Sequence, residues 1–77
     1  MIKPGMKFKN SFMELTVLCY DEISDKNLAL LFSTNDEMFI TVRNLSKYKD
    51  EYAWCWGHYF IDIRDAVKDY DERKKDL

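Results

Sequence analysis

Apolar and polar residues alternate along most of the chain, which is the pattern of strands that bury one face. A short alternation of apolar residues with lysine marks residues 6–9, and a longer alternating run follows at residues 12–20. Residues 28–32 are almost wholly apolar, which is typical of a strand covered on both faces. Turn-forming residues separate these runs at short intervals. The pattern predicts strands at about 5–9, 12–20, 27–33, 37–43 and 52–60.

Helical periodicity begins only after residue 61. Asp62 is placed to cap the first turn of a helix through its side chain. Four apolar residues then recur at the spacing of one helix face, namely Ile63, Ala66, Val67 and Tyr70. This spacing predicts a helix at about 62–73, followed by a charged tail at 74–77.

Five strands at short spacing, without helices between them, favour antiparallel pairing of neighbours. The sequence therefore predicts an α+β fold: a five-stranded antiparallel β-meander with one C-terminal α-helix packed on it. The sheet is either an open curled sheet or an SH3-like half-barrel. With 77 residues, the chain is expected to form a single domain at 1–77.

The last predicted strand holds both tryptophans and the single histidine of the chain. Strict alternation gives it a bulky face made of Tyr52, Trp54, Trp56, His58 and Phe60. The opposite face is mostly small and consists of Ala53, Cys55, Gly57 and Tyr59. We expect the helix to pack on the small face. The bulky face then lies either in the core or in an interface with a partner or a second copy.

Composition narrows the class of protein. The net charge is −2, and the three lysines at positions 3, 7 and 9 form a basic N-terminal end. The acidic remainder lacks the basic footprint usual for duplex DNA binding. Cys19 and Cys55 are too few for a disulfide scaffold and are expected to be free thiols of a reducing compartment. No apolar run approaches the length of a membrane span, so we expect a cytoplasmic protein without a membrane partner.

Candidate chemistry is mostly excluded by spacing. Cys55 and His58 are three residues apart, so strict alternation places them on opposite faces of the strand and excludes a local dyad. Two cysteines and one histidine do not match the ligand spacing of zinc sites. The two glycines, Gly5 and Gly57, form no phosphate-binding loop. The sequence predicts a protein that is not an enzyme, with no catalytic residue, metal or cofactor.

One segment carries a resemblance to known proteins. Residues 54–60, Trp-Cys-Trp-Gly-His-Tyr-Phe, are followed by Asp62, Ala66, Tyr70 and then charged residues. This ending resembles a pattern in small uncharacterised proteins from phages and mobile elements of Gram-positive bacteria. The resemblance covers the C-terminal strand and helix only, and it assigns no functional residue. It implies a phage accessory factor that acts in the cytoplasm of the host cell.

The predicted function is that of a small non-enzymatic binding protein that acts by occupying a partner. The resemblance implies that the partner is a host protein, such as a defence or regulatory protein, and the acidic surface would suit a basic, nucleic-acid-handling target. The predicted binding residues are Tyr52, Trp54, Trp56 and His58, because aromatic residues dominate binding hot spots. The alternative is an oligomeric module that sequesters a nucleotide, or binds single-stranded nucleic acid, through the same aromatic strand.

Overall fold

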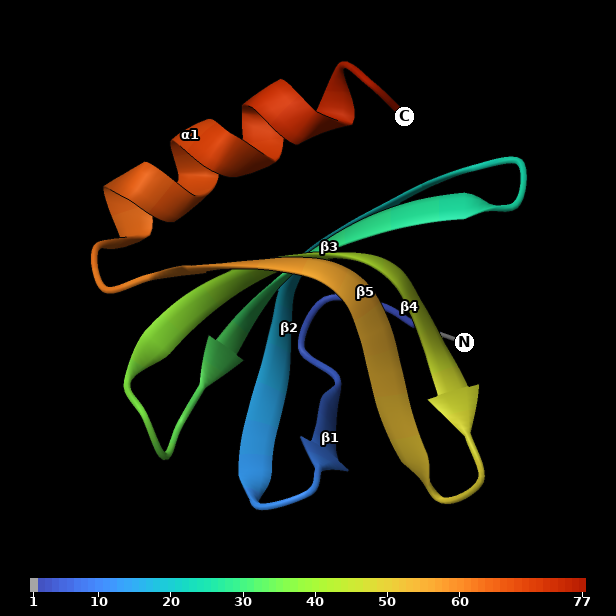
Figure 1. The fold of residues 1–77 in the computed structure, drawn as a ribbon, viewed down its shortest axis with the longest axis vertical. Coiled ribbons are helices and arrows are strands. Elements are labelled where there is room, and N and C mark those ends of the chain that lie inside the picture. The colour runs from blue at the N-terminus through green and yellow to red at the C-terminus, as the bar shows by residue number, and fades with distance from the viewer. Residues whose placement is uncertain (1) are drawn as a thin grey trace.

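The computed structural model describes residues 2–77 as one antiparallel sheet and one helix (Figure 1). The strands are β1 (Lys7–Asn10), β2 (Met13–Ile23), β3 (Lys26–Ser33), β4 (Met38–Tyr48) and β5 (Glu51–Phe60). They lie in the sheet in chain order, and the helix α1 (Ile63–Lys74) follows. The predicted α+β meander, curled into a half-barrel with a C-terminal helix, is confirmed. Met1, with which the predicted domain begins, lies outside the described residues.

Two strands are longer than predicted. β2 continues to Ile23 and β4 continues to Tyr48, beyond the predicted ends at about 20 and 43. The hairpin turns that follow them are tight, and each contains a residue with positive φ, Ser24 at 57° and Lys49 at 59°. Paired strands satisfy their backbone groups through the ladder, whatever the polarity of their side chains. β2 and β4 therefore continue through residues that are too polar to predict a strand.

The inner face of the curled sheet encloses the main core. Its buried apolar residues come from all strands but the last: Phe8, Leu15, Val17, Ala29, Leu31, Ile40, Val42 and Leu45. Tyr52 and Trp54 of β5 pack against this core and are half-buried. The curl also brings β1 beside β5, where the Phe8 and Tyr52 rings lie 5.0 Å apart. Asn10 Nδ2 donates to the Tyr52 carbonyl at 2.6 Å across this seam.

The outer face of the sheet carries the helix. α1 buries Ala66 and Tyr70 against Leu28 and Leu30 of β3, and Phe39 and Phe60 pack at the margin of this second core. The prediction that the helix covers the small face of the last strand is therefore wrong. Of the predicted apolar stripe, Ile63 and Val67 remain exposed. The reason is that α1 crosses the middle strands of the sheet and reaches only the end of β5.

The two ends of α1 are held by polar contacts. The side chain of Asp62 accepts a hydrogen bond from the Arg64 backbone N–H at 2.8 Å, which confirms the predicted N-cap. Near the C-terminal end, the Tyr70 hydroxyl donates to Asp21 Oδ2 at 2.6 Å. Burial, with the hydrogen bond to Asp21 and its negative charge, raises the pKa of Tyr70 far above its ordinary value. The hydroxyl therefore stays a proton donor that ties the helix to β2.

Candidate binding surface

Three β-bulges interrupt the ladder, each by one extra residue. The first is at Leu18 in β2, between the pairs Val17–Leu31 and Cys19–Leu30. The other two lie close together in the β4–β5 ladder, where Trp56–Gly57 of β5 and Asn44–Leu45 of β4 each oppose a single residue. A one-residue insertion reverses which face the following side chains take. The face of each strand therefore changes at its bulge.

The bulge in β5 divides the predicted bulky face. Tyr52 and Trp54 lie on the inner face, against the core. His58 and Phe60 lie on the outer face, opposite Thr41 and Phe39 of β4. The single aromatic face predicted for residues 52–60 is therefore wrong, because alternation restarts with the opposite phase after the bulge.

Trp56 is the residue at which the phase changes. Its φ is 55°, a left-handed conformation that is rare for a large side chain. Its side chain is 73% exposed, so the indole contributes little to either core. Among residues 2–77, the other non-glycine residues with positive φ are all polar: Ser11, Ser24, Glu37, Asn44 and Lys49. Trp56 is the aromatic exception.

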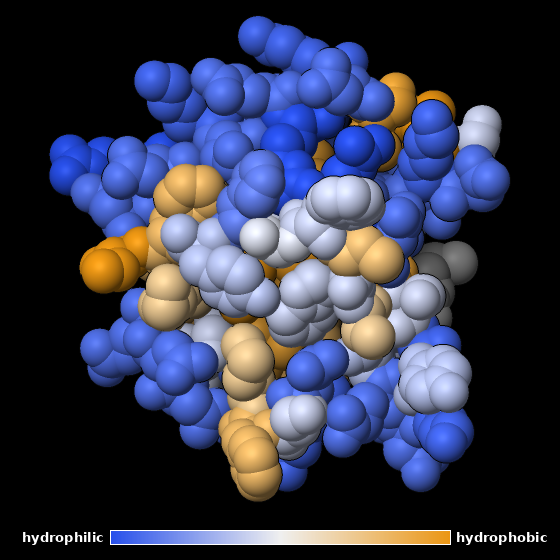
Figure 2. Space-filling model, in the orientation of Figure 1, coloured by the Kyte–Doolittle hydropathy of each residue, from blue (hydrophilic) through white to orange (hydrophobic). Residues whose placement is uncertain are grey.

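Further aromatic and apolar surface adjoins Trp56. Tyr59 is 53% exposed and Ile61 is 82% exposed. A Cβ atom on Gly57 would lie 3.0 Å from Nε1 of Trp54 and 3.2 Å from Oη of Tyr59, so both rings reach the glycine. We call the set Trp54, Trp56, Tyr59 and Ile61 the β5 aromatic surface. Figure 2 shows pale and orange surface gathered across the middle of the molecule, over β5, and bordered by hydrophilic surface.

His58 does not belong to this surface. Its Nδ1 lies 2.9 Å from Asp69 Oδ2 on α1. The same carboxylate oxygen accepts from the buried Thr41 hydroxyl at 2.6 Å. Arg73 Nη1 in turn donates to the Thr41 hydroxyl and to the Thr41 carbonyl, both at 3.0 Å. These contacts fasten α1 to β4 and β5, so the geometry gives His58 a positioning role.

The charge state of Asp69 follows from these partners. Partial burial raises the pKa of Asp69, but hydrogen bonds from Thr41 and His58, and the charges of His58 and Arg73, outweigh it. The pKa of Asp69 therefore lies below its ordinary value. Burial lowers the pKa of Arg73. The charge of Asp69 raises this pKa and the charge of Arg43 lowers it, and the net shift is downward. This helix-to-sheet anchor was not predicted, because its members are far apart in sequence and no local pattern links them.

Acidic side chains on α1 lie beside the C-terminal end of β5, next to His58 and Phe60. Asp65, Asp69 and Glu72 follow the i, i+4, i+7 spacing of one helix face. Together with Lys68 and with Phe60 of β5, they line a shallow hollow of about 280 Å³. Asp65 and Glu72 are exposed, and neither forms a salt bridge within residues 2–77. We call Asp65, Asp69 and Glu72 the acidic row.

The structure changes the predicted positions of Cys55 and His58 relative to each other. Cys55 pairs with Arg43 and His58 pairs with Thr41, and the bulge between them puts both on the outer face. The predicted separation onto opposite faces is therefore wrong. Within residues 2–77, however, no hydrogen bond joins the Cys55 thiol to the His58 ring. The hydrogen bond of the imidazole at Nδ1 is made to Asp69.

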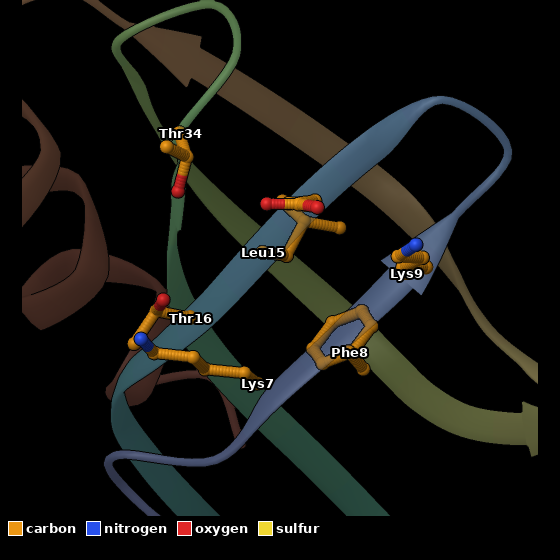
Figure 3. A pocket seen from close by; sticks show the side chains of 7 residues that line it. Lys7, Phe8, Lys9, Leu15, Thr16 and Thr34 are labelled. Atoms are coloured by element: carbon orange, nitrogen blue, oxygen red, sulfur yellow. The ribbon is translucent and has the colours of Figure 1, made fainter.

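A second hollow, of about 370 Å³, lies on the opposite edge of the sheet (Figure 3). It is lined by Lys7 and Lys9 of β1, Glu14 and Thr16 of β2, and Thr34 of the β3–β4 turn, together with Phe8 and Leu15. Lys7 extends toward Thr16, its partner in the ladder. The lining combines two ammonium groups with one carboxylate, so it selects neither a phosphate nor a cation.

Within residues 2–77, no group of three His, Cys, Asp or Glu residues is arranged to hold a metal ion. In the same part of the chain, α1 is too short and too polar to cross a membrane as a helix.

Comparison with known proteins gave no assignment. Neither protein-family models, nor curated proteins, nor solved structures match this chain. The site has to be interpreted from its own geometry. Of the predicted binding residues, Trp56 is exposed, and Trp54 is half-buried at the edge of the β5 aromatic surface. Tyr52 packs against the core, and His58 contacts Asp69 of α1. Tyr59 was missed because strict alternation, without the bulge, assigned it to the face expected under the helix. Ile61 was missed because it follows the strand predicted at 52–60.

Proposed function

We propose that this protein is a binding protein that occupies a partner protein through the β5 aromatic surface. The observation that carries the proposal is the combination of exposure and backbone conformation at Trp56. A left-handed conformation costs a non-glycine residue about 1–2 kcal/mol, and an indole left in water gains almost none of its burial energy. Both terms disfavour tryptophan at this position in the free protein. A partner that buries the ring accounts for both.

The surroundings of Trp56 support a protein partner. Binding hot spots are rich in Trp and Tyr and lie beside groups that shield them from water. Tyr59 and the edge of Trp54 meet at Gly57, next to Trp56, and Ile61 extends the same stretch of chain. A surface of exposed side chains suits a protein better than an enclosed small molecule, which needs a concave site. The resemblance described above predicts that the partner is a host defence or regulatory protein.

The proposal is tested by site-specific crosslinking in the native host. A photoreactive benzoylphenylalanine replaces Trp56 in one variant and Phe12 in a control. Phe12 is 96% exposed in the turn between β1 and β2, away from the β5 aromatic surface. We expect a discrete protein adduct from position 56 that excess wild-type protein suppresses and excess Trp56→Ser does not. Equal adducts from both positions, or none from position 56, would contradict the proposal.

Nucleotide binding is separated by a second measurement. If the aromatic strand stacks bases, nucleotides or a short single-stranded oligonucleotide will quench the emission of wild-type protein, and the quenching will fall in Trp56→Ser. We expect no such quenching at moderate salt. Salt-sensitive quenching that depends on Trp56 would replace the proposed function by the nucleotide alternative.

A further inference from the structure

We infer that the partner presents an arginine-bearing segment to the β5 aromatic surface and the acidic row. This inference rests on the proposed function and specifies the chemistry of the partner. Two features with different chemistry meet at β5: aromatic rings on the strand itself, and carboxylates of α1 that reach its outer face at His58 and Phe60. Figure 2 shows the pale surface over β5 running directly up to the hydrophilic surface of α1.

The acidic row reaches β5 itself. Asp69 contacts His58 of β5, and Phe60 lines the same hollow as Asp65 and Glu72. A partner that covers the end of β5 therefore meets these carboxylates as well. Asp69 is occupied by Thr41 and His58, which leaves Asp65 and Glu72 as the exposed acceptors. Lys68 is the one base that lines the hollow, and it reduces the negative charge without cancelling it.

Arginine matches both features at once. Its guanidinium stacks on aromatic rings, with tryptophan the best of them, and donates paired hydrogen bonds to a carboxylate. Lysine offers a point charge and a weaker stack. A segment with arginine at more than one position can place one side chain on Trp56 and another on Asp65 or Glu72. Charge complementarity of this kind steers association and excludes acidic partners.

The same charges argue against the other occupants. A second copy docked on this surface by two-fold symmetry brings two acidic rows to one interface, where like charges oppose association. A nucleic acid brings phosphates toward the same carboxylates and meets the same repulsion. The hollow beside Phe60 therefore selects a basic protein segment over both.

The test uses a fluorescein-labelled synthetic peptide that alternates arginine with glycine, titrated with the full chain and followed by anisotropy. We expect binding at low salt that weakens as salt is added, and no binding of the matching glutamate peptide. Trp56→Ser is expected to weaken binding about fivefold. Asp65→Asn with Glu72→Gln is expected to weaken it about tenfold, and Lys68→Ala to strengthen it. Circular dichroism confirms that α1 is retained in each variant.

The matched control removes the same charge elsewhere. Asp25 and Asp50 lie in the β2–β3 and β4–β5 turns and are exposed, so Asp25→Asn with Asp50→Asn should leave binding within about twofold. An equal loss in this control, tight binding of the glutamate peptide or of an oligonucleotide, or a dimer in light scattering would overturn the inference. Position-56 crosslinking does not depend on the charge of the partner. If the arginine peptide does not bind but position 56 still forms an adduct, only the inference about arginine fails. If position 56 forms no adduct, the proposed function fails as well.

Discussion

Trp56 and Gly57 divide two backbone roles in an unexpected way. Glycine tolerates positive φ at almost no steric cost, yet the positive φ of this bulge belongs to Trp56. Gly57 is used for close approach instead, because a Cβ there would lie 3.0 Å from the Trp54 indole nitrogen. The consequence is a strained tryptophan that points away from both cores. Strain of this kind persists only where the surrounding structure imposes it.

Substitutions at Trp56 should show this strain directly. At ordinary strand positions glycine is about 0.5–1 kcal/mol less stable than alanine. At position 56 we expect the reverse, with Trp56→Gly more stable than Trp56→Ala by about 1 kcal/mol, because alanine retains the left-handed penalty. Chemical unfolding measures both free energies. Ala53→Gly, on the same strand and exposed, is the control and should lose about 0.5–1 kcal/mol. A more stable alanine variant at position 56 would refute the assignment of strain.

At the scale of elements, local patterns predicted five strands and a helix but not the faces of β5. Tyr52, Trp54, His58 and Phe60 alternate without a break, so nothing within residues 52–60 indicates a bulge. β4 does contain a signal, because Ile40 and Val42 are followed by Leu45 rather than by an apolar residue 44, and Asn44 tolerates positive φ. Trp54 packs against the core that contains Leu45, and this contact joins two strands. The pattern of a single strand therefore does not predict it.

The phase of β5 can be tested by deletion. Removing Trp56 should straighten the bulge and leave every other β5 residue on its present face, so we expect a folded protein. Removing Ala53 instead should turn Tyr52 out of the core, at a cost of about 2 kcal/mol. Thermal unfolding of the two single deletions, with circular dichroism of the native state, compares them. Greater damage from the Trp56 deletion than from the Ala53 deletion would show that the bulge itself is needed to curl the sheet.

Asp69 links α1 to the sheet through its contacts with Thr41 and His58. Its pKa is about 3.9 in an unfolded chain and lower in the folded one, so the folded state binds fewer protons between the two values. The stability that Asp69 contributes is therefore present above about pH 4 and is lost as the pH falls through its folded pKa. We expect Asp69→Asn to cost about 1–2 kcal/mol near neutral pH, and this difference to shrink in acid.

Urea unfolding across a pH series measures the difference between wild type and Asp69→Asn. Asp76→Asn makes the same charge change at an exposed residue just beyond α1, and it should have a small effect at every pH. A cost at Asp69 that stays constant down to pH 2, or one equal to that at Asp76, would show that the contacts with Thr41 and His58 do not stabilise the fold.

At the scale of the whole molecule, the half-barrel is closed by side chains rather than by a ladder. β1 and β5 are the first and last strands in the sheet order, and they meet through Asn10 and the Tyr52 carbonyl, and through the Ser11 N–H and Glu51. The Phe8 and Tyr52 rings fill the space beneath. A chain of this size has little core to spare, so the loss of contacts across this seam should lower its stability. It also holds β5, and with it the β5 aromatic surface, against the rest of the sheet.

Substitutions at Asn10 that weaken the contact between β1 and β5 should therefore also disturb the β5 aromatic surface. Asn10→Ala removes the donor to the Tyr52 carbonyl and is expected to cost about 1–2 kcal/mol, while Asn10→Asp should cost more because its carboxylate faces that carbonyl oxygen. Lys9→Ala, an exposed neighbour, should stay within about 0.5 kcal/mol. Chemical unfolding gives the free energies, and the emission of Trp54, measured in a Trp56→Phe background, reports whether β5 has moved off the core. If Asn10→Asp unfolds no more easily than Lys9→Ala, the hydrogen bond from Asn10 to the Tyr52 carbonyl does not hold the first and last strands together.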